Sequence, residues 1–190
     1  MERLRVAAMR VFAERGYHAA RVDDIVRAAR TSHGTFYLYF SNKEELLREL
    51  AVACADAIEA LACDIGPVTC DAAGIAELER FLGRFLSTYA DFGPVIRAWM
   101  EDHVADREVN RLGVHAFTAI ASSFAGRIGE VGGDASPARV GALMALLERF
   151  AYYVSSGRVD GTDPVVLSTL ALTVHRGFFV AAAPLVGTRH

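Results

Sequence analysis

Residues 17–46 decide the fold of this chain, and they read YHAARVDDIVRAARTSHGTFYLYFSNKEEL. Residues 22–29 have the composition of a short helix, residues 30–32 form a polar turn, and residues 33–39 form a second short helix. Two short helices joined by such a turn make a helix-turn-helix. The stretch therefore predicts a helical N-terminal domain built around this motif.

The second helix of the motif has small hydrogen-bonding side chains at its start and aromatic side chains further on. A recognition helix presents its N-terminal residues to base edges in the major groove. Tyrosine hydroxyl groups, and a lysine at the start of the next helix, can bind the flanking phosphates and fix the register. The predicted DNA contacts in this segment are Thr31, Ser32, His33, Gly34, Thr35, Tyr37, Tyr39 and Lys43.

Each of these residues has an ordinary structural alternative. The hydroxyl side chains of Ser32 and Thr35 would then only cap the helix, and the tyrosines would belong to the core. His33 would face solvent. Phe36 and Phe40 are spaced to face inward, so we expect both in the core.

The rest of the chain is punctuated as helices. An apolar stripe at Leu4, Ala8, Val11 and Phe12 has helical spacing, and Gly16 follows as a stop. The spacing of Ser41 and Glu44 matches a capping box that opens a long helix, and Gly66-Pro67 ends it. A further helix is expected to end at Phe92-Gly93-Pro94, with Pro94 opening the next. Strand-period alternation is missing from the sequence, so the predicted fold class is all-α.

Composition and charge narrow the function. Of the 190 residues, 53% are hydrophobic and 23% are charged, which excludes intrinsic disorder. The net charge of −3 hides an asymmetry, because residues 1–50 sum to +2 and the remainder to −5. A basic end on an acidic body suggests that a polyanion is contacted at that end.

The location of the protein is also suggested by the sequence. Its three cysteines, Cys54, Cys63 and Cys70, lack metal-ligand spacing and are odd in number, so we expect a reducing cytoplasm. The N-terminus lacks the pattern of a signal peptide. The stretch from Val165 to Val186 has the length of a membrane helix, but His175-Arg176 at its centre argues against one.

Ser136-Pro137 and Asp163-Pro164 each form the pattern of an N-cap followed by a first-turn proline. They open two helices, residues 137–156 and 164–183, that are apolar on more than one face. Such helices must be covered all round, so we expect a second copy of the chain to cover them, the alternative being a central place in one bundle. The predicted homodimer interface consists of Val140, Met144, Leu147, Leu167, Leu170, Val174 and Phe178.

Together these features resemble the DNA-binding domain of the TetR family of transcriptional regulators. The resemblance is carried by Gly16-Tyr17, residues 22–29, residues 32–40 and residues 43–46. It implies a helix-turn-helix DNA-binding domain at residues 1–45 and a helical ligand-binding and dimerisation body at residues 46–190.

Two positions depart from the family pattern. Ala20-Arg21 replaces the usual Thr or Ser cap of the second helix, and Arg21 is a further predicted phosphate contact. Arg30-Thr31 replaces the usual Gly-Val turn. If the turn geometry is kept, Arg30 needs a positive φ, which costs a residue with a side chain.

The resemblance also implies an inducer site in the body. Aromatic and polar side chains on several helices are its predicted lining: Phe81, Phe85, Tyr89, Trp99, His103, Phe117, Phe124 and Tyr153. Burial of apolar surface is the simplest source of the differential affinity that moves a switch, so we expect an apolar or amphipathic small-molecule effector. No cofactor is expected.

The resulting hypothesis is a homodimeric, ligand-responsive repressor that binds double-stranded, palindromic operator DNA. One alternative is a regulator whose body responds to no ligand. A second is a helical enzyme or hydrophobic carrier that happens to hold a helix-turn-helix. The sequence has no phosphate loop, nucleophile elbow or HExxH motif, so we do not expect an enzyme.

Overall fold

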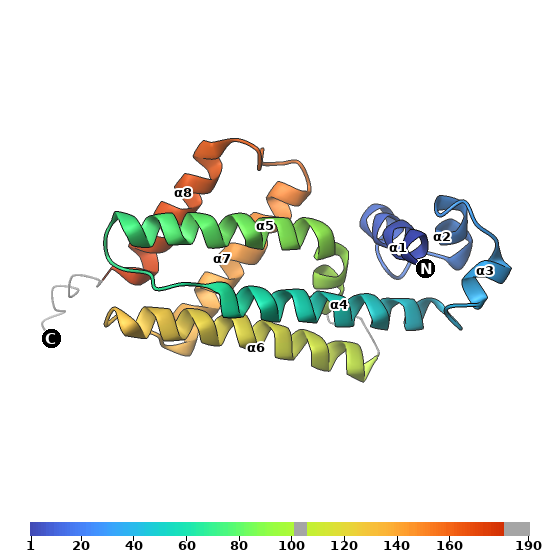
Figure 1. Ribbon diagram of the computed structural model, residues 1–190, viewed down its shortest axis with the longest axis horizontal. Coiled ribbons are helices and arrows are strands. Elements are labelled where there is room, and N and C mark those ends of the chain that lie inside the picture. The colour runs from blue at the N-terminus through green and yellow to red at the C-terminus, as the bar shows by residue number, and fades with distance from the viewer. Residues whose placement is uncertain (101–105, 181–190) are drawn as a thin grey trace, which may run out of the picture. The chain divides into compact units, whose positions relative to one another are not determined.

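Figure 1 shows the computed structural model, which describes residues 1–100 and 106–180. Regular structure in these ranges is helical without any strand, so the all-α prediction is confirmed. The helices are α1 (Glu2–Arg15), α2 (Val22–Ala28), α3 (His33–Tyr37), α4 (Lys43–Asp64), α5 (Ala72–Met100), α6 (Arg107–Glu130), α7 (Pro137–Ser155), α8 (Pro164–Val174) and the π-helical turn η1 (His175–Phe179). Among the described helices, none combines the length and the apolarity that crossing a membrane requires.

The chain divides into two compact units. The first consists of Met1–Ile58 and Asp91–Phe117, and the second of Glu59–Ala90 and Thr118–His190. Helices α4, α5 and α6 each contribute to both units. The functional boundary at residue 45 that the resemblance implies stays a prediction.

The first unit contains the helix-turn-helix. The predicted stripe on α1 is buried, with Leu4, Ala8, Val11 and Phe12 each no more than 4% exposed. Gly16 ends α1 as expected: its φ is 75°, and its N–H donates to the carbonyl of Phe12 at 3.0 Å. Helix α1 packs against α2, and α2 packs against α3.

The start of α4 differs from the prediction by one residue. Asn42, not Ser41, caps the helix, because Asn42 Oδ1 accepts the N–H of Glu45 at 2.8 Å. The glutamate that reaches back is Glu45 and not Glu44, and it accepts the N–H of Ser41 at 2.6 Å. The chemistry of a capping box is present, but the predicted pair was wrong because neighbouring residues offer the same groups.

The predicted helix break at Phe92-Gly93-Pro94 was wrong. Helix α5 runs without interruption from Ala72 to Met100 and contains Pro94. A proline removes one N–H from the helical ladder and costs about 3 kcal/mol in a helix interior. Burial on both sides offsets that cost here, because Tyr89, Val95 and Ile96 are at most 5% exposed.

The second unit is held by aromatic packing and by long-range hydrogen bonds. Phe81 and Phe124 pack edge to face with ring centroids 5.3 Å apart, and both are fully buried. The Arg127 guanidinium donates twice to the carbonyl of Ile65, at 2.9 and 3.1 Å. Tyr89 Oη donates to the buried Glu148 carboxylate at 3.0 Å.

The starts of the last two helices are confirmed. Helix α7 ends at Ser155, one residue before the predicted end, whereas the helical part of the last element ends earlier than predicted. Pro137 and Pro164 both stand at first-turn positions, and Asp163 Oδ1 accepts the N–H of Val165 at 2.8 Å. The α-helical part of the last element ends at Val174 and continues as η1, where His175 Nε2 lies 2.8 Å from the carbonyl of Thr69. The part of the predicted helix after residue 180 lies outside the described residues.

Candidate nucleic-acid interface

The start of α3 is organised by its own hydroxyl groups. Ser32 Oγ accepts the N–H of Thr35 at 3.1 Å and lies 3.0 Å from Thr35 Oγ1. Ser32 is exposed and Thr35 is partly exposed, so the capping role leaves both side chains accessible. Ser32 can therefore cap the helix in the free protein, and both hydroxyl groups can still reach a bound duplex.

His33, the first residue of α3, is oriented by α2. Its Nε2 lies 2.8 Å from Asp23 Oδ1, and both side chains are substantially exposed. The contact links the two helices of the motif and presents the imidazole beside Ser32. In the free protein this contact orients the ring of His33.

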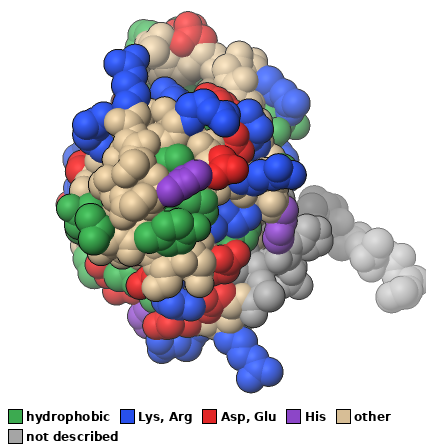
Figure 2. Space-filling model, turned by 90° about the vertical axis from the view of Figure 1, so that its right-hand side faces the viewer, with side chains coloured by type: hydrophobic (Ala, Val, Ile, Leu, Met, Phe, Trp, Pro, Cys, Tyr) green, Lys and Arg blue, Asp and Glu red, His purple; other side chains and the backbone are tan. Residues whose placement is uncertain are grey.

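The aromatic residues of α3 and of the three residues after it separate into core and surface. Phe36 and Phe40 are buried, as predicted, and their ring centroids lie 5.7 Å apart. Tyr37 and Tyr39 are 59% and 48% exposed, so neither is a core aromatic. Leu38 is 80% exposed, which is unusual for a large apolar side chain. Figure 2 shows hydrophobic side chains and a histidine together on this face, with lysine or arginine side chains above and beside them.

Lys43 has a structural role that sequence reasoning missed. Its Nζ donates to the carbonyls of Tyr17 and Ala20 at 2.8 and 3.0 Å, and it lies 4.4 Å from the centre of the Tyr17 ring. Burial lowers the pKa of Lys43, and burial together with Glu44 raises the pKa of Tyr17. Lys43 thus ties the α1–α2 loop to the start of α4, and its predicted phosphate contact stays a prediction.

The missing Ser or Thr cap of α2 is replaced by Asp24. Its carboxylate accepts the N–H of Arg21 at 3.3 Å, while the N–H of Asp24 donates to the carbonyl of Arg21 at 3.0 Å. Arg15 and Arg27 pair with the same carboxylate at 3.5 and 3.4 Å. The side chain of Arg21 remains exposed, as a phosphate contact would require.

The turn of the helix-turn-helix has a positive φ at Arg30, a conformation that is unfavourable for a residue with a side chain. Arg30 has a φ of 51°, which confirms the expected left-handed conformation. Thr31 follows with its N–H donating to the carbonyl of Val26 at 3.0 Å. Thr31 is partly exposed and Gly34 is exposed, so this segment presents backbone and small side chains to the outside.

The predicted inducer-site residues are distributed over the two units. In the second unit, Phe81 packs against Phe124, and the ring centroids of Phe85 and Tyr89 lie 6.5 Å apart. Tyr153 is 39% exposed. Glu148, the buried partner of Tyr89, was missed because a carboxylate in an apolar helix carries no sequence signal of its contact.

The other inducer-site residues lie in the first unit or outside the described part. Trp99 packs edge to face on Phe117, with ring centroids 6.3 Å apart. A Cβ added at Gly113 would lie 2.7 Å from Trp99 Cγ, so the absence of a side chain there is what admits the indole. His103 lies outside the described residues.

The second unit has an open groove between α5 and the turn that joins α7 to α8. Its volume is about 580 Å³. Its lining consists of Gly83, Leu86, Ser87, Val154, Gly157, Val159, Asp160, Gly161, Thr162 and Leu167. Leu167, one of the predicted interface residues, is the only predicted site residue in this lining.

The predicted dimer-interface residues fall into two groups. Val140, Leu147, Leu170 and Val174 are already buried within one chain. Met144, Leu167 and Phe178 are partly exposed. The exposed face of α7 begins with the small residues Ala138, Gly141, Ala142 and Ala145 and continues with Arg149 and Tyr153.

The N-terminal segment is similar in sequence to known bacterial regulators. Residues 4–50 match the family described as "Bacterial regulatory proteins, tetR family". The fatty acid metabolism regulator protein of Bacillus subtilis (strain 168) is 50% identical over 44 residues, which are 23% of each chain. The HTH-type transcriptional regulator YvdT of the same organism is 46% identical over 50 residues, 26% of each chain. The chain thus aligns with about a quarter of the length of these curated relatives.

Solved structures have a similar fold over most of the length of this chain. FadR of Bacillus subtilis, in complex with stearoyl-CoA, is similar with a TM-score of 0.62 at 22% identity, over 92% of this chain and 96% of that one. The TetR family transcriptional regulator PfmR of Thermus thermophilus has a TM-score of 0.64 at 17% identity, over 96% of both chains. At these identities the likeness concerns the fold.

Proposed function

We propose that the protein is a DNA-binding transcriptional repressor, because its residues 4–50, which contain the helix-turn-helix, match the tetR family of bacterial regulatory proteins. The observation that carries the proposal is the face of α3. Hydroxyl, imidazole and tyrosine side chains are exposed there, while Phe36 and Phe40 anchor the helix from below. Such a helix can enter the major groove without rearranging its core.

The proposed regulator is a homodimer that works in the cytoplasm and binds a palindromic operator. Two-fold symmetric proteins read two half-sites about 34–36 Å apart. A change in the distance between the two DNA-binding domains of the dimer, called heads below, therefore changes the affinity for the operator. Regulation by a small molecule fits this arrangement. A ligand that binds one conformation of the body more tightly raises the population of that conformation, and with it one distance between the heads. On this proposal the protein is not an enzyme.

Salt dependence and one hydroxyl group test DNA binding. The affinity for a cognate operator should fall with salt with a log–log slope of about −0.9 for each phosphate neutralised. Tyr37→Phe removes only an exposed hydroxyl, so binding to every sequence should weaken alike, by about 1 kcal/mol or fivefold. Fluorescence anisotropy over a range of salt concentrations measures both quantities.

Tyr153→Phe is the matched control, since it removes the hydroxyl of a partly exposed tyrosine in the second unit. It should leave DNA affinity unchanged. Salt-independent binding by the wild type, or equal affinities of the Tyr37→Phe variant and the wild type, would contradict the assignment of this face to DNA.

We further propose that the effector is an amphipathic acyl compound. FadR of Bacillus subtilis, which has this fold, was solved with stearoyl-CoA, and that compound is the first one to test. The close packing of Phe81 on Phe124 favours the rival view that the body binds no ligand, because these predicted pocket side chains fill each other's space.

Thermal unfolding decides between these two views. Stearoyl-CoA at 100 times its dissociation constant would stabilise the protein by about 2.7 kcal/mol, which is a shift of several degrees. It should also release the operator. Coenzyme A without the acyl chain is the control and should do neither. An unchanged melting temperature with long, medium and short acyl chains would favour the ligand-independent regulator.

A further inference from the structure

Arg30 adopts a backbone conformation that its side chain makes unfavourable. Among residues 1–100 and 106–180 it is the only residue other than glycine with a positive φ, 51°. Left-handed backbone is rare for residues other than glycine, asparagine and aspartate. The side chain is exposed, so burial of its surface does not offset the strain. Such strain persists where the surrounding structure enforces it, and it gathers at functional sites.

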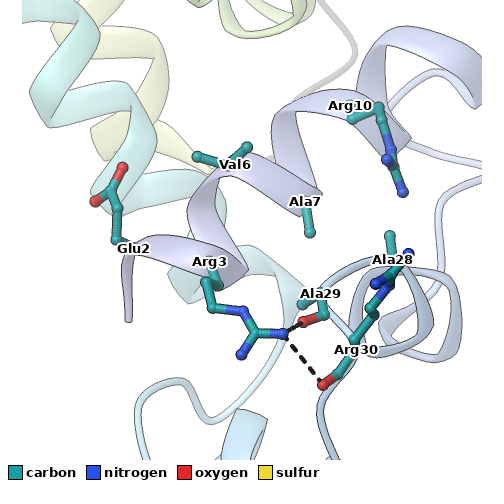
Figure 3. Close-up of a pocket in the computed structure, with 8 residues that line it drawn as sticks. All are labelled: Glu2, Arg3, Val6, Ala7, Arg10, Ala28, Ala29 and Arg30. Carbon is teal, nitrogen blue, oxygen red and sulfur yellow. Dashed lines mark hydrogen bonds between the residues drawn. The ribbon is translucent and has the colours of Figure 1, made fainter.

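A second arginine holds the turn in place. Arg3 Nη2, on the first turn of α1, donates to the carbonyl of Ala29 at 2.7 Å and to that of Arg30 at 3.4 Å. Figure 3 shows both bonds, with the Arg3 guanidinium beside the carbonyl groups of Ala29 and Arg30. These contacts use the backbone of Arg30 and leave its guanidinium available.

The guanidinium groups of Arg10 and Arg30 point toward one another across a groove (Figure 3). The groove has a volume of about 340 Å³ and is lined by Glu2, Arg3, Val6, Ala7, Arg10, Ala28, Ala29 and Arg30. Its one carboxylate, Glu2, lies 3.4 Å from Arg5, and Arg10 lies 3.8 Å from Glu14. Within the described ranges, Arg30 has no ion-pair partner. Like charges that converge in this way repel each other unless an anion lies between them.

One residue of the groove, Arg30, belongs to the turn that leads into α3. Arg30 precedes Ser32 by two residues, so their Cα atoms are within about 7.6 Å of each other. Phosphates follow one another about every 3.4 Å along each strand of a duplex. A strand that flanks α3 in the major groove therefore offers phosphates within reach of a long arginine side chain at this turn.

We propose that Arg30, assisted by Arg10, forms a second phosphate-binding site of the head and binds the DNA backbone beside the recognition helix. This inference rests on the proposed function and extends it. It gives the strained arginine a reason, since a glycine at this position would relieve the strain and remove the cation. Arg3 acts as a positioning residue that fixes the turn.

Arg30→Asn separates the two properties of this residue. Asparagine tolerates left-handed backbone, so the melting temperature should stay unchanged or rise by about 2–4 °C. Loss of one charge-assisted phosphate contact should weaken DNA binding about tenfold and reduce the salt slope by about 0.9. Arg30→Lys keeps the charge and should retain the slope.

Arg27→Asn is the matched control, because it removes a charge from α2 that already pairs with Asp24 at 3.4 Å. It should change the slope much less. Equal affinity and slope for the Arg30→Asn variant and the wild type would overturn this inference, as would an Arg27→Asn effect of the same size. If the wild type does not bind DNA at all, the proposed function itself fails. Arg10→Ala gives an independent reading, with a smaller loss of affinity expected.

Discussion

Replacing Phe36 by alanine should unfold the helix-turn-helix and abolish operator binding. Phe36 is fully buried. Its ring centroid lies 5.7 Å from that of Phe40 and 5.4 Å from that of Tyr37, which it meets edge to face. Truncation of a buried phenylalanine costs about 3–5 kcal/mol, while a typical protein has only about 5–15 kcal/mol of stability. Helix α3 has five residues and little stability of its own, so it depends on this packing. Circular dichroism and anisotropy with operator DNA measure the two losses.

The control is Leu38→Ala, at the C-cap of the same helix. Leu38 is 80% exposed, so its truncation should change the free energy of unfolding by no more than about 0.5 kcal/mol. If the Phe36→Ala variant melts and binds DNA like the wild type, the buried aromatic core does not position α3. A large loss of stability in Leu38→Ala would show instead that this side chain is covered in the protein in solution.

Features that depend on a few neighbouring residues could be predicted from the sequence. The stripe on α1, the stop at Gly16 and the burial of Phe36 and Phe40 follow from spacing that a few residues contain. The positive φ of Arg30 could also be predicted, because the resemblance defines the turn. The cap of α4 was displaced by one residue because Ser41 and Asn42 offer equivalent side chains.

Contacts between distant residues could not be predicted in the same way. Lys43 bonds to the carbonyl of Tyr17, 26 residues away, and Tyr89 bonds to Glu148, 59 residues away. Neither pairing leaves a periodic signal, because each depends on how whole helices pack. Pro94 illustrates the same point: its intrinsic preference favours a helix start, and burial of the neighbouring side chains kept the helix continuous.

Burial also changes how the predicted dimer must be tested. A charge at Leu147 or Leu170 would destabilise a single chain, since both side chains are at most 3% exposed within it. Loss of the dimer could then not be distinguished from unfolding. The exposed face of α7 offers a better position, because Ala142 is accessible in one chain and small enough for a partner helix to approach closely.

Ala142→Glu should therefore give a folded monomer with strongly reduced operator affinity. The substitution places a charge where we expect the partner's apolar helix, so it disfavours the dimer without disturbing the core of the single chain. A monomer binds one half-site and loses the advantage of two linked heads, which amounts to about 10²–10⁴ in affinity. Sedimentation velocity at micromolar concentration, circular dichroism and anisotropy measure assembly, folding and binding. Ala53→Glu places the same charge at an exposed alanine of α4, outside the predicted interface, and should remain dimeric and bind normally. A dimeric Ala142→Glu variant, or a wild type that sediments as a monomer, would show that this face of α7 is not the interface through which two heads are joined.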